Sequence, residues 1–136
     1  MYLIFALLSA LTAALVAIFG KIGLEKVDTT LATAIRSVVM AAILVLAVLL
    51  LKKWDLSQID NKAYLFILLA GLAGAASWLF YFLALKLGPA TAVVAIDRLS
   101  IIFVIIFASL FLGESLSLKT ILGGALIILG ALLLIK

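Results

Sequence analysis

Five long apolar segments, separated by short polar connections, constrain this chain more than any other feature of its sequence. They run over residues 1–20, 29–51, 63–87, 89–113 and 117–135. A transmembrane α-helix needs about 20 mostly apolar residues, whereas the strands of a membrane barrel have about ten residues that alternate in polarity. These segments are close to the helical length and do not alternate. The sequence therefore predicts an all-α polytopic membrane protein with five transmembrane helices.

The composition excludes most other classes of protein. Of the 136 residues, 69% are hydrophobic and 12% are charged, whereas about 25% are charged in an average soluble domain. The chain has no Cys and no His, which removes thiol nucleophiles, imidazole metal ligands and Ser-His-Asp chemistry. We therefore expect no enzyme activity, no metal and no cofactor. The net charge of +4 comes with lysines that flank the apolar segments, where lipid headgroups rather than nucleic acid are the expected partner.

The connections are too short to hold a second domain, so residues 1–136 are expected to form a single one. Gly88 and Pro89 favour a tight turn, with Pro89 in the first turn of the next helix. Ser117 is suited to cap the last helix. The first segment has no positively charged residues before it and is longer than the apolar part of a usual signal peptide. We expect it to remain as a membrane helix.

With five helices, the lysines of the loops and termini divide evenly between the two sides of the membrane. Lys52, Lys53, Lys62 and Lys119 fall on the N-terminal side, and Lys21, Lys26, Lys86 and Lys136 on the other. The charge asymmetry that normally sets orientation is therefore nearly absent. One interpretation is a single orientation set by a weaker signal. The other is insertion in both orientations, with two opposed copies pairing as an antiparallel homodimer that reproduces the inverted repeats of many transporters.

Three motifs follow one another in the C-terminal half: an alanine-rich helix end before KLGPA at residues 86–90, FLGE at residues 111–114, and a last helix punctuated by glycine. The N-terminal half adds Phe19-Gly20-Lys21 at the end of the first helix and Arg36 early in the second. In these features the whole chain resembles the EamA domain of the drug/metabolite transporter superfamily, in its short single-repeat prokaryotic form.

This resemblance implies one five-helix half of a ten-helix inverted-repeat transporter. It also implies transport of small organic solutes and a multi-pass location in the plasma membrane of a prokaryote. One departure limits it. The related small multidrug resistance transporters rely on a glutamate in the first helix, and this chain has no acidic residue there. Their proton-coupled export of cations is therefore not implied.

Several polar and aromatic side chains are predicted to lie at one depth in the membrane. At 1.5 Å per residue, they lie roughly 9–13 Å from the same face. They are Thr12, Arg36, Trp78, Tyr81 and Asp97, and Arg98 follows Asp97 directly in the sequence. A charged side chain costs about 2.5–3.5 kcal/mol at the centre of a membrane helix, so the charged ones should face protein or a wet cavity. We interpret this layer as a candidate site for substrate binding or coupling, although Thr12 also suits a packing contact between helices.

The other members of this layer have structural as well as functional interpretations. Asp97 is a candidate for binding a cation or an amine, or for carrying a proton. Arg36 or Arg98 would hold a carboxylate or another anion. Arg36 and Asp97 are equally compatible with a buried structural ion pair. Trp78 and Tyr81, three residues apart on one helix, either line a cavity or serve as packing residues.

The predicted function is that of a membrane transporter subunit. It would move a small organic solute or metabolite by alternating access, as an antiparallel homodimer. Its expected partners are the solute, membrane lipid and a second copy of the chain. Two alternatives remain open. A non-transporting accessory subunit of another membrane complex would move nothing when purified alone, and a passive channel would show flux without saturation or counterflow.

Overall fold

The structure is a computed structural model, and it describes residues 1–57 and 59–135. Its helices are α1 (Tyr2–Gly23), α2 (Thr29–Leu50), α3 (Asn61–Leu87), α4 (Ala90–Asp97), α5 (Ser100–Phe111) and α6 (Leu118–Leu134). The described residues contain no strand. Helices α1, α2, α3 and the combined stretch Ala90–Phe111 are long and apolar enough to cross a membrane, and α6 is a shorter apolar helix. The predicted all-α membrane fold of about five helices is confirmed. Lys136, counted above in the charge balance, lies outside the described residues.

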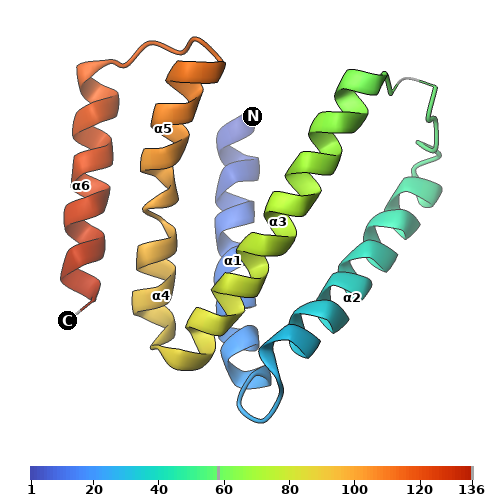
Figure 1. The fold of residues 1–136 in the computed structure, drawn as a ribbon, viewed down its shortest axis with the longest axis horizontal. Helices are drawn as coiled ribbons and strands as arrows, with labels where there is room; N and C mark the ends of the chain where they lie inside the picture. Colours follow the sequence, from blue (N-terminus) through green and yellow to red (C-terminus); the bar gives the residue numbers. More distant parts are fainter. Residues whose placement is uncertain (58, 136) are drawn as a thin grey trace. The chain divides into compact units, whose positions relative to one another are not determined.

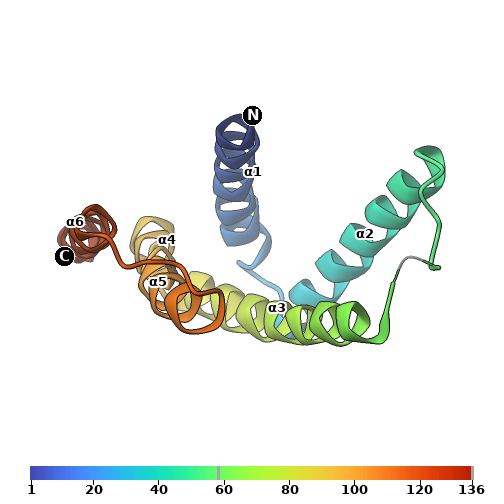
Figure 2. The same ribbon diagram turned by 90° about the horizontal axis from the view of Figure 1, so that it is seen from above.

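The chain divides into two compact units. The central unit, Phe19–Lys86, contains the end of α1, all of α2 and nearly all of α3. Within it, α2 and α3 are closest where α2 begins and α3 ends, and they diverge toward the connection between them (Figure 1, Figure 2). The terminal unit combines Met1–Ile18 with Leu87–Lys136. In this unit α6 runs beside α4 and α5 (Figure 1).

Polar side chains cap the N-terminal ends of α2 and α6. Asp28 caps α2, because its carboxylate accepts hydrogen bonds from the backbone N–H groups of Thr30 and Leu31, at 2.9 and 3.0 Å. Ser117 caps α6 by accepting a hydrogen bond from Thr120 N at 3.1 Å, as the sequence predicts. These bonds satisfy N–H groups that have no partner inside the helix. Pro89 stands at the N-cap of α4, one residue before the helix begins rather than in its first turn.

The segment predicted as one helix over residues 89–113 forms two, α4 and α5. Between them, Leu99 N donates to Ile96 O at 2.9 Å and Ile102 N donates to Leu99 O at 3.0 Å. Hydrogen bonds to the third preceding residue mark a tighter turn of the 3₁₀ type. The sequence did not predict this interruption because residues 96–100 contain neither Gly nor Pro. Arg98, one of the candidate site residues, lies in the interruption.

The first helix, α1, continues to Gly23, three residues past its predicted end. Lys21 therefore lies in its last turn, where a positive charge is favourable beside the unpaired carbonyl groups of a helix end.

Most large apolar side chains of the chain are exposed, and the buried ones are few. The buried apolar residues are Ala17, Leu24, Phe82, Leu85, Ala92, Ala95, Ala108 and Ala131. Leu, Ile and Phe side chains are exposed along every helix, including Phe80 of α3 and Phe111 of α5. A water-soluble protein rarely exposes contiguous apolar surface on this scale. A lipid environment explains both the exposed apolar surface and the all-helical backbone, since helices satisfy their own hydrogen bonds in a bilayer.

Candidate solute-binding site

Arg36 lies over the face of Trp78 in the central unit. Its Cζ atom is 3.5 Å from the centroid of the indole ring and 5.6 Å from that of Phe82. Arg36 is the eighth residue of α2, about two turns into the helix, and both aromatic residues come from the last half of α3. A cation over an aromatic face is attracted by the negative charge density of the ring, most strongly over Trp. The structure thus brings together two of the residues that the sequence singled out.

Tyr81 joins this group through the aromatic cluster on α3. The ring centroids of Trp78 and Tyr81 are 5.4 Å apart in an edge-to-face arrangement. Phe82 lies 5.8 Å from Trp78 and 6.2 Å from Tyr81. Phe82 was not among the predicted site residues, although its position four residues after Trp78 places both side chains on the same helix face. Phe82 is buried, whereas Trp78 and Tyr81 are half-buried.

One end of the Arg36 guanidinium group has no hydrogen-bond partner. Its Nη1 atom is buried, and none of the described residues accepts a hydrogen bond from it. An arginine near the centre of a membrane helix costs about 2.5–3.5 kcal/mol. The contact with Trp78 offsets up to about 2 kcal/mol of this, and a buried N–H left unpaired costs about 1–3 kcal/mol more. Trp78 therefore holds the guanidinium group in place but leaves the Nη1 hydrogen-bond donors without an acceptor among the described residues.

Asp97 and Arg98 belong to the terminal unit, where α4 ends. Both side chains are exposed. Arg98 borders a cavity of about 370 Å³ that is also lined by Ser100, Ile101, Val104 and Ile127. It also borders an apolar cavity of about 400 Å³ between α1, α4 and α6. Arg36 lies in the other unit, so its predicted ion pair with Asp97 stays a prediction.

Thr12 uses its hydroxyl group within its own helix. The Oγ1 atom lies 3.0 Å from the carbonyl oxygens of both Leu8 and Ser9, and the side chain is exposed. A single O–H shared between two such carbonyls satisfies the hydroxyl locally. Its role in solute binding or in packing between helices stays a prediction.

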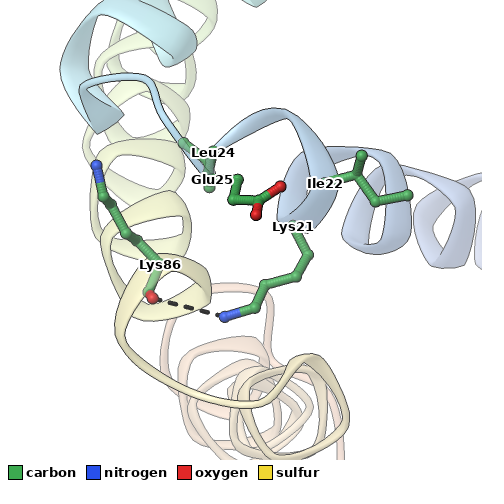
Figure 3. A pocket seen from close by; sticks show the side chains of 5 residues that line it. All are labelled: Lys21, Ile22, Leu24, Glu25 and Lys86. Carbon is green, nitrogen blue, oxygen red and sulfur yellow. Dashed lines mark hydrogen bonds between the residues drawn. The ribbon is translucent and has the colours of Figure 1, made fainter.

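A second polar group, which was not among the predicted site residues, lies in the central unit where α1 and α3 end. Lys21 Nζ donates to Leu85 O at 2.5 Å and to Lys86 O at 3.5 Å, while Lys86 Nζ donates to Val27 O at 2.7 Å. Figure 3 shows Lys21, Glu25 and Lys86 around a cavity of about 410 Å³ that Ile22 and Leu24 also line. From the sequence, these lysines were expected to contact lipid headgroups. Their positions near the C-terminal ends of helices could have predicted the observed bonds, because lysine can cap free carbonyls there.

This lysine pair fastens the end of α3 to the end of α1 and to the loop before α2. The carbonyls of the last helical turn lack partners inside the helix, and Lys21 supplies one for Leu85. We therefore assign the pair a structural role. No group of three or more acidic residues that could hold a metal ion occurs in residues 1–57 and 59–135.

Comparison with known proteins agrees with this architecture. The model of the EamA-like transporter family matches residues 1–136. A protein of Sinorhizobium sp described as "Uncharacterized transporter in cobO 3' region" is 49% identical over 130 residues, which cover 95% of this chain and 92% of that protein. No solved structure matched the chain. A family match over the full length, together with a relative of nearly the same size, shows that this multi-pass membrane protein belongs to the EamA-like transporter family.

Proposed function

We propose that this chain is a transporter subunit that moves a small organic solute by alternating access in the plasma membrane of a prokaryote. One observation carries the proposal: Arg36 of α2 lies over the ring of Trp78 of α3, and one buried nitrogen of its guanidinium group has no hydrogen-bond partner among the described residues. The chain also belongs to a transporter family. Ionisable groups inside membrane segments generally mark substrate or ion pathways. We propose no enzymatic reaction for it.

We further propose that two copies in opposite orientations form the working unit. The lysines on the two sides of the membrane are balanced, and orientation depends on their asymmetry. Many transporters bind their solute between two inverted repeats, and five helices correspond to one repeat. An antiparallel homodimer would supply the second repeat.

Transport is tested with the purified chain alone in liposomes. The liposomes are loaded with a defined mixture of amino acids, organic acids and amines, and the released compounds are identified by mass spectrometry. We expect selective release of one class, with saturation and counterflow. Release of nothing would favour an accessory subunit, and unsaturable release of the whole mixture would favour a passive channel. Either result contradicts the proposal.

Orientation is tested with a single cysteine, because the chain has none of its own. Ser57 is suitable, since it is exposed in the loop between α2 and α3. In intact cells, Ser57→Cys should react in part with an impermeant maleimide, and the remainder should react only after the membrane is permeabilised. Complete labelling from one side alone would exclude dual insertion.

Asp97 is proposed to couple transport to a proton or to bind a cationic group of the solute. The charge-neutral variant Asp97→Asn keeps the shape of the side chain and cannot be ionised. We expect it to lose the pH dependence of transport. Unchanged rates and an unchanged pH profile would remove Asp97 from the mechanism.

A further inference from the structure

Arg36 carries a buried side-chain nitrogen that has no hydrogen-bond partner among the described residues. Trp78 covers one face of its guanidinium group, with Cζ 3.5 Å from the ring centroid. Such a contact leaves the N–H groups at the edge of the guanidinium plane free to donate hydrogen bonds. The buried Nη1 atom has no acceptor among the described residues.

The neighbouring polar groups of the same helix are engaged elsewhere. Thr33 Oγ1 donates to Thr29 O at 2.7 Å, and Ser37 Oγ donates to Thr33 O at 2.8 Å. The carboxylate of Asp28, at the start of α2, accepts the hydrogen bonds that cap this helix. Among the described residues of the central unit, none accepts a hydrogen bond from Nη1, so a bound molecule is the acceptor that we consider next.

We propose that Arg36 binds the carboxylate group of a small organic monoanion, and that this is the class of solute transported. A planar guanidinium edge matches a carboxylate in a two-point, charge-assisted hydrogen bond. A single positive charge is neutralised by a single negative charge, whereas a dianionic phosphate would leave uncompensated charge within the membrane. Trp78 and Tyr81 provide an aromatic wall for the apolar part of the solute. This inference rests on the proposed transport function, because it names the solute of the same site.

Trp78 itself provides the probe for a binding experiment. The chain has only two tryptophans, so Trp54→Phe leaves Trp78 as the single reporter beside Arg36. The purified variant, in nanodiscs of phosphatidylcholine, is titrated with butyrate, with its neutral counterpart butyramide and with inorganic phosphate. We expect a saturable fluorescence change with butyrate and none with the other two compounds.

Two substitutions at Arg36 separate charge from geometry. Arg36→Lys keeps the charge but loses the planar pair of donors, so the butyrate midpoint should rise about tenfold, as for the loss of one charge-assisted hydrogen bond. Arg36→Met should abolish the response. Lys53→Gln, which removes a positive charge from the loop after α2, serves as the matched control and should leave the midpoint unchanged. Circular dichroism of each variant checks that it remains folded.

The outcomes distinguish this inference from the transport proposal. An equal response to butyramide, a response to phosphate alone, no saturable response to butyrate, or an unchanged midpoint in Arg36→Lys overturns the carboxylate assignment. Selective, saturable release of amines or neutral compounds from liposomes would leave transport standing while the assignment fails. Butyrate binding without any release would support the binding site and contradict transport.

Discussion

The two units of the molecule are held together by different kinds of contact. In the central unit, the buried apolar side chains are large, Leu24, Phe82 and Leu85, and Thr33 is also buried in the same unit. Lysine ammonium groups bind carbonyls where α1 and α3 end. In the terminal unit, the buried residues are mostly alanine, and Gly124 of α6 is also buried. Small residues let helix backbones approach closely in a membrane. The comparison indicates that one unit depends on specific polar and aromatic partners, and the other on close backbone packing.

The largest expected effect follows from removing the aromatic support of Arg36. Trp78→Ala takes away a contact worth up to about 2 kcal/mol in a desolvated site, so transport should slow by up to about thirtyfold. Counterflow of the solute identified in the efflux assay measures the rate. Trp54→Ala, in the exposed loop of the same unit, is the matched control and should transport normally. Equal rates for both variants would show that Trp78 is a packing residue only.

The next effect tests how tightly the central unit is packed. A Cβ atom at Gly20 would lie 2.8 Å from Phe82 Cε1 and 3.5 Å from Leu85 Cδ1. Gly20→Ala should therefore lower the free energy of unfolding by about 1–2 kcal/mol, as overpacking generally does. Thermal unfolding in detergent, followed by circular dichroism, measures the change. Gly23→Ala, where a Cβ meets nothing within 4 Å, should show no such loss.

The equivalent change in the terminal unit sharpens the contrast. A Cβ at Gly124 would meet only Ile105 Cδ1, at 3.2 Å, which is the mobile end of a side chain. Gly124→Ala should therefore cost less than Gly20→Ala. A larger loss at Gly124 would reverse the comparison, because it would make close packing in the terminal unit the more demanding of the two.

A smaller effect is expected from the lysine that closes the central unit. Lys21→Met removes the hydrogen bonds to Leu85 O and Lys86 O, and a partly exposed bond of this kind contributes about 1 kcal/mol. The same unfolding measurement should show a loss of that size. Lys26→Met, at an exposed position in the loop that follows α1, should be neutral. If both variants unfold alike, Lys21 serves only as a contact to lipid headgroups.

The smallest effect concerns the cap of α2. Hydrogen bonds from the backbone of Leu31 and Thr30 hold the pKa of Asp28 below its ordinary value of 3.8. Because the pKa is lower in the folded state, the charged cap stabilises the protein above the ordinary pKa, and this contribution is lost as the pH falls through the lowered value. Asp28→Asn keeps a capping oxygen and should flatten this part of the pH profile of unfolding. Asp28→Ala should also destabilise the protein at neutral pH. A profile in Asp28→Asn identical to that of the parent chain would assign the acid sensitivity to other carboxylates.

The membrane fold followed from the sequence because length and hydropathy alone determine which segments can cross a bilayer. Ser117 as a helix cap was predictable for a similar reason, since capping depends on neighbouring residues. The interruption at Arg98 and Leu99 was not, because no residue there breaks helices by itself. For the candidate site, the sequence predicted Arg36, Trp78 and Tyr81 but not Phe82. The contact between Phe82 and Arg36 forms only because α2 approaches α3.

The sequence by itself determined an all-helical membrane protein of the EamA type, with scarce charges that need a partner away from lipid. Only the tertiary structure decided that Arg36 meets Trp78 rather than a carboxylate within the central unit, and that Lys21 and Lys86 bind carbonyls. The physical reason is range. Hydropathy and capping act over one or two helical turns, whereas the partner of a buried charge depends on which helices pack together and at what height.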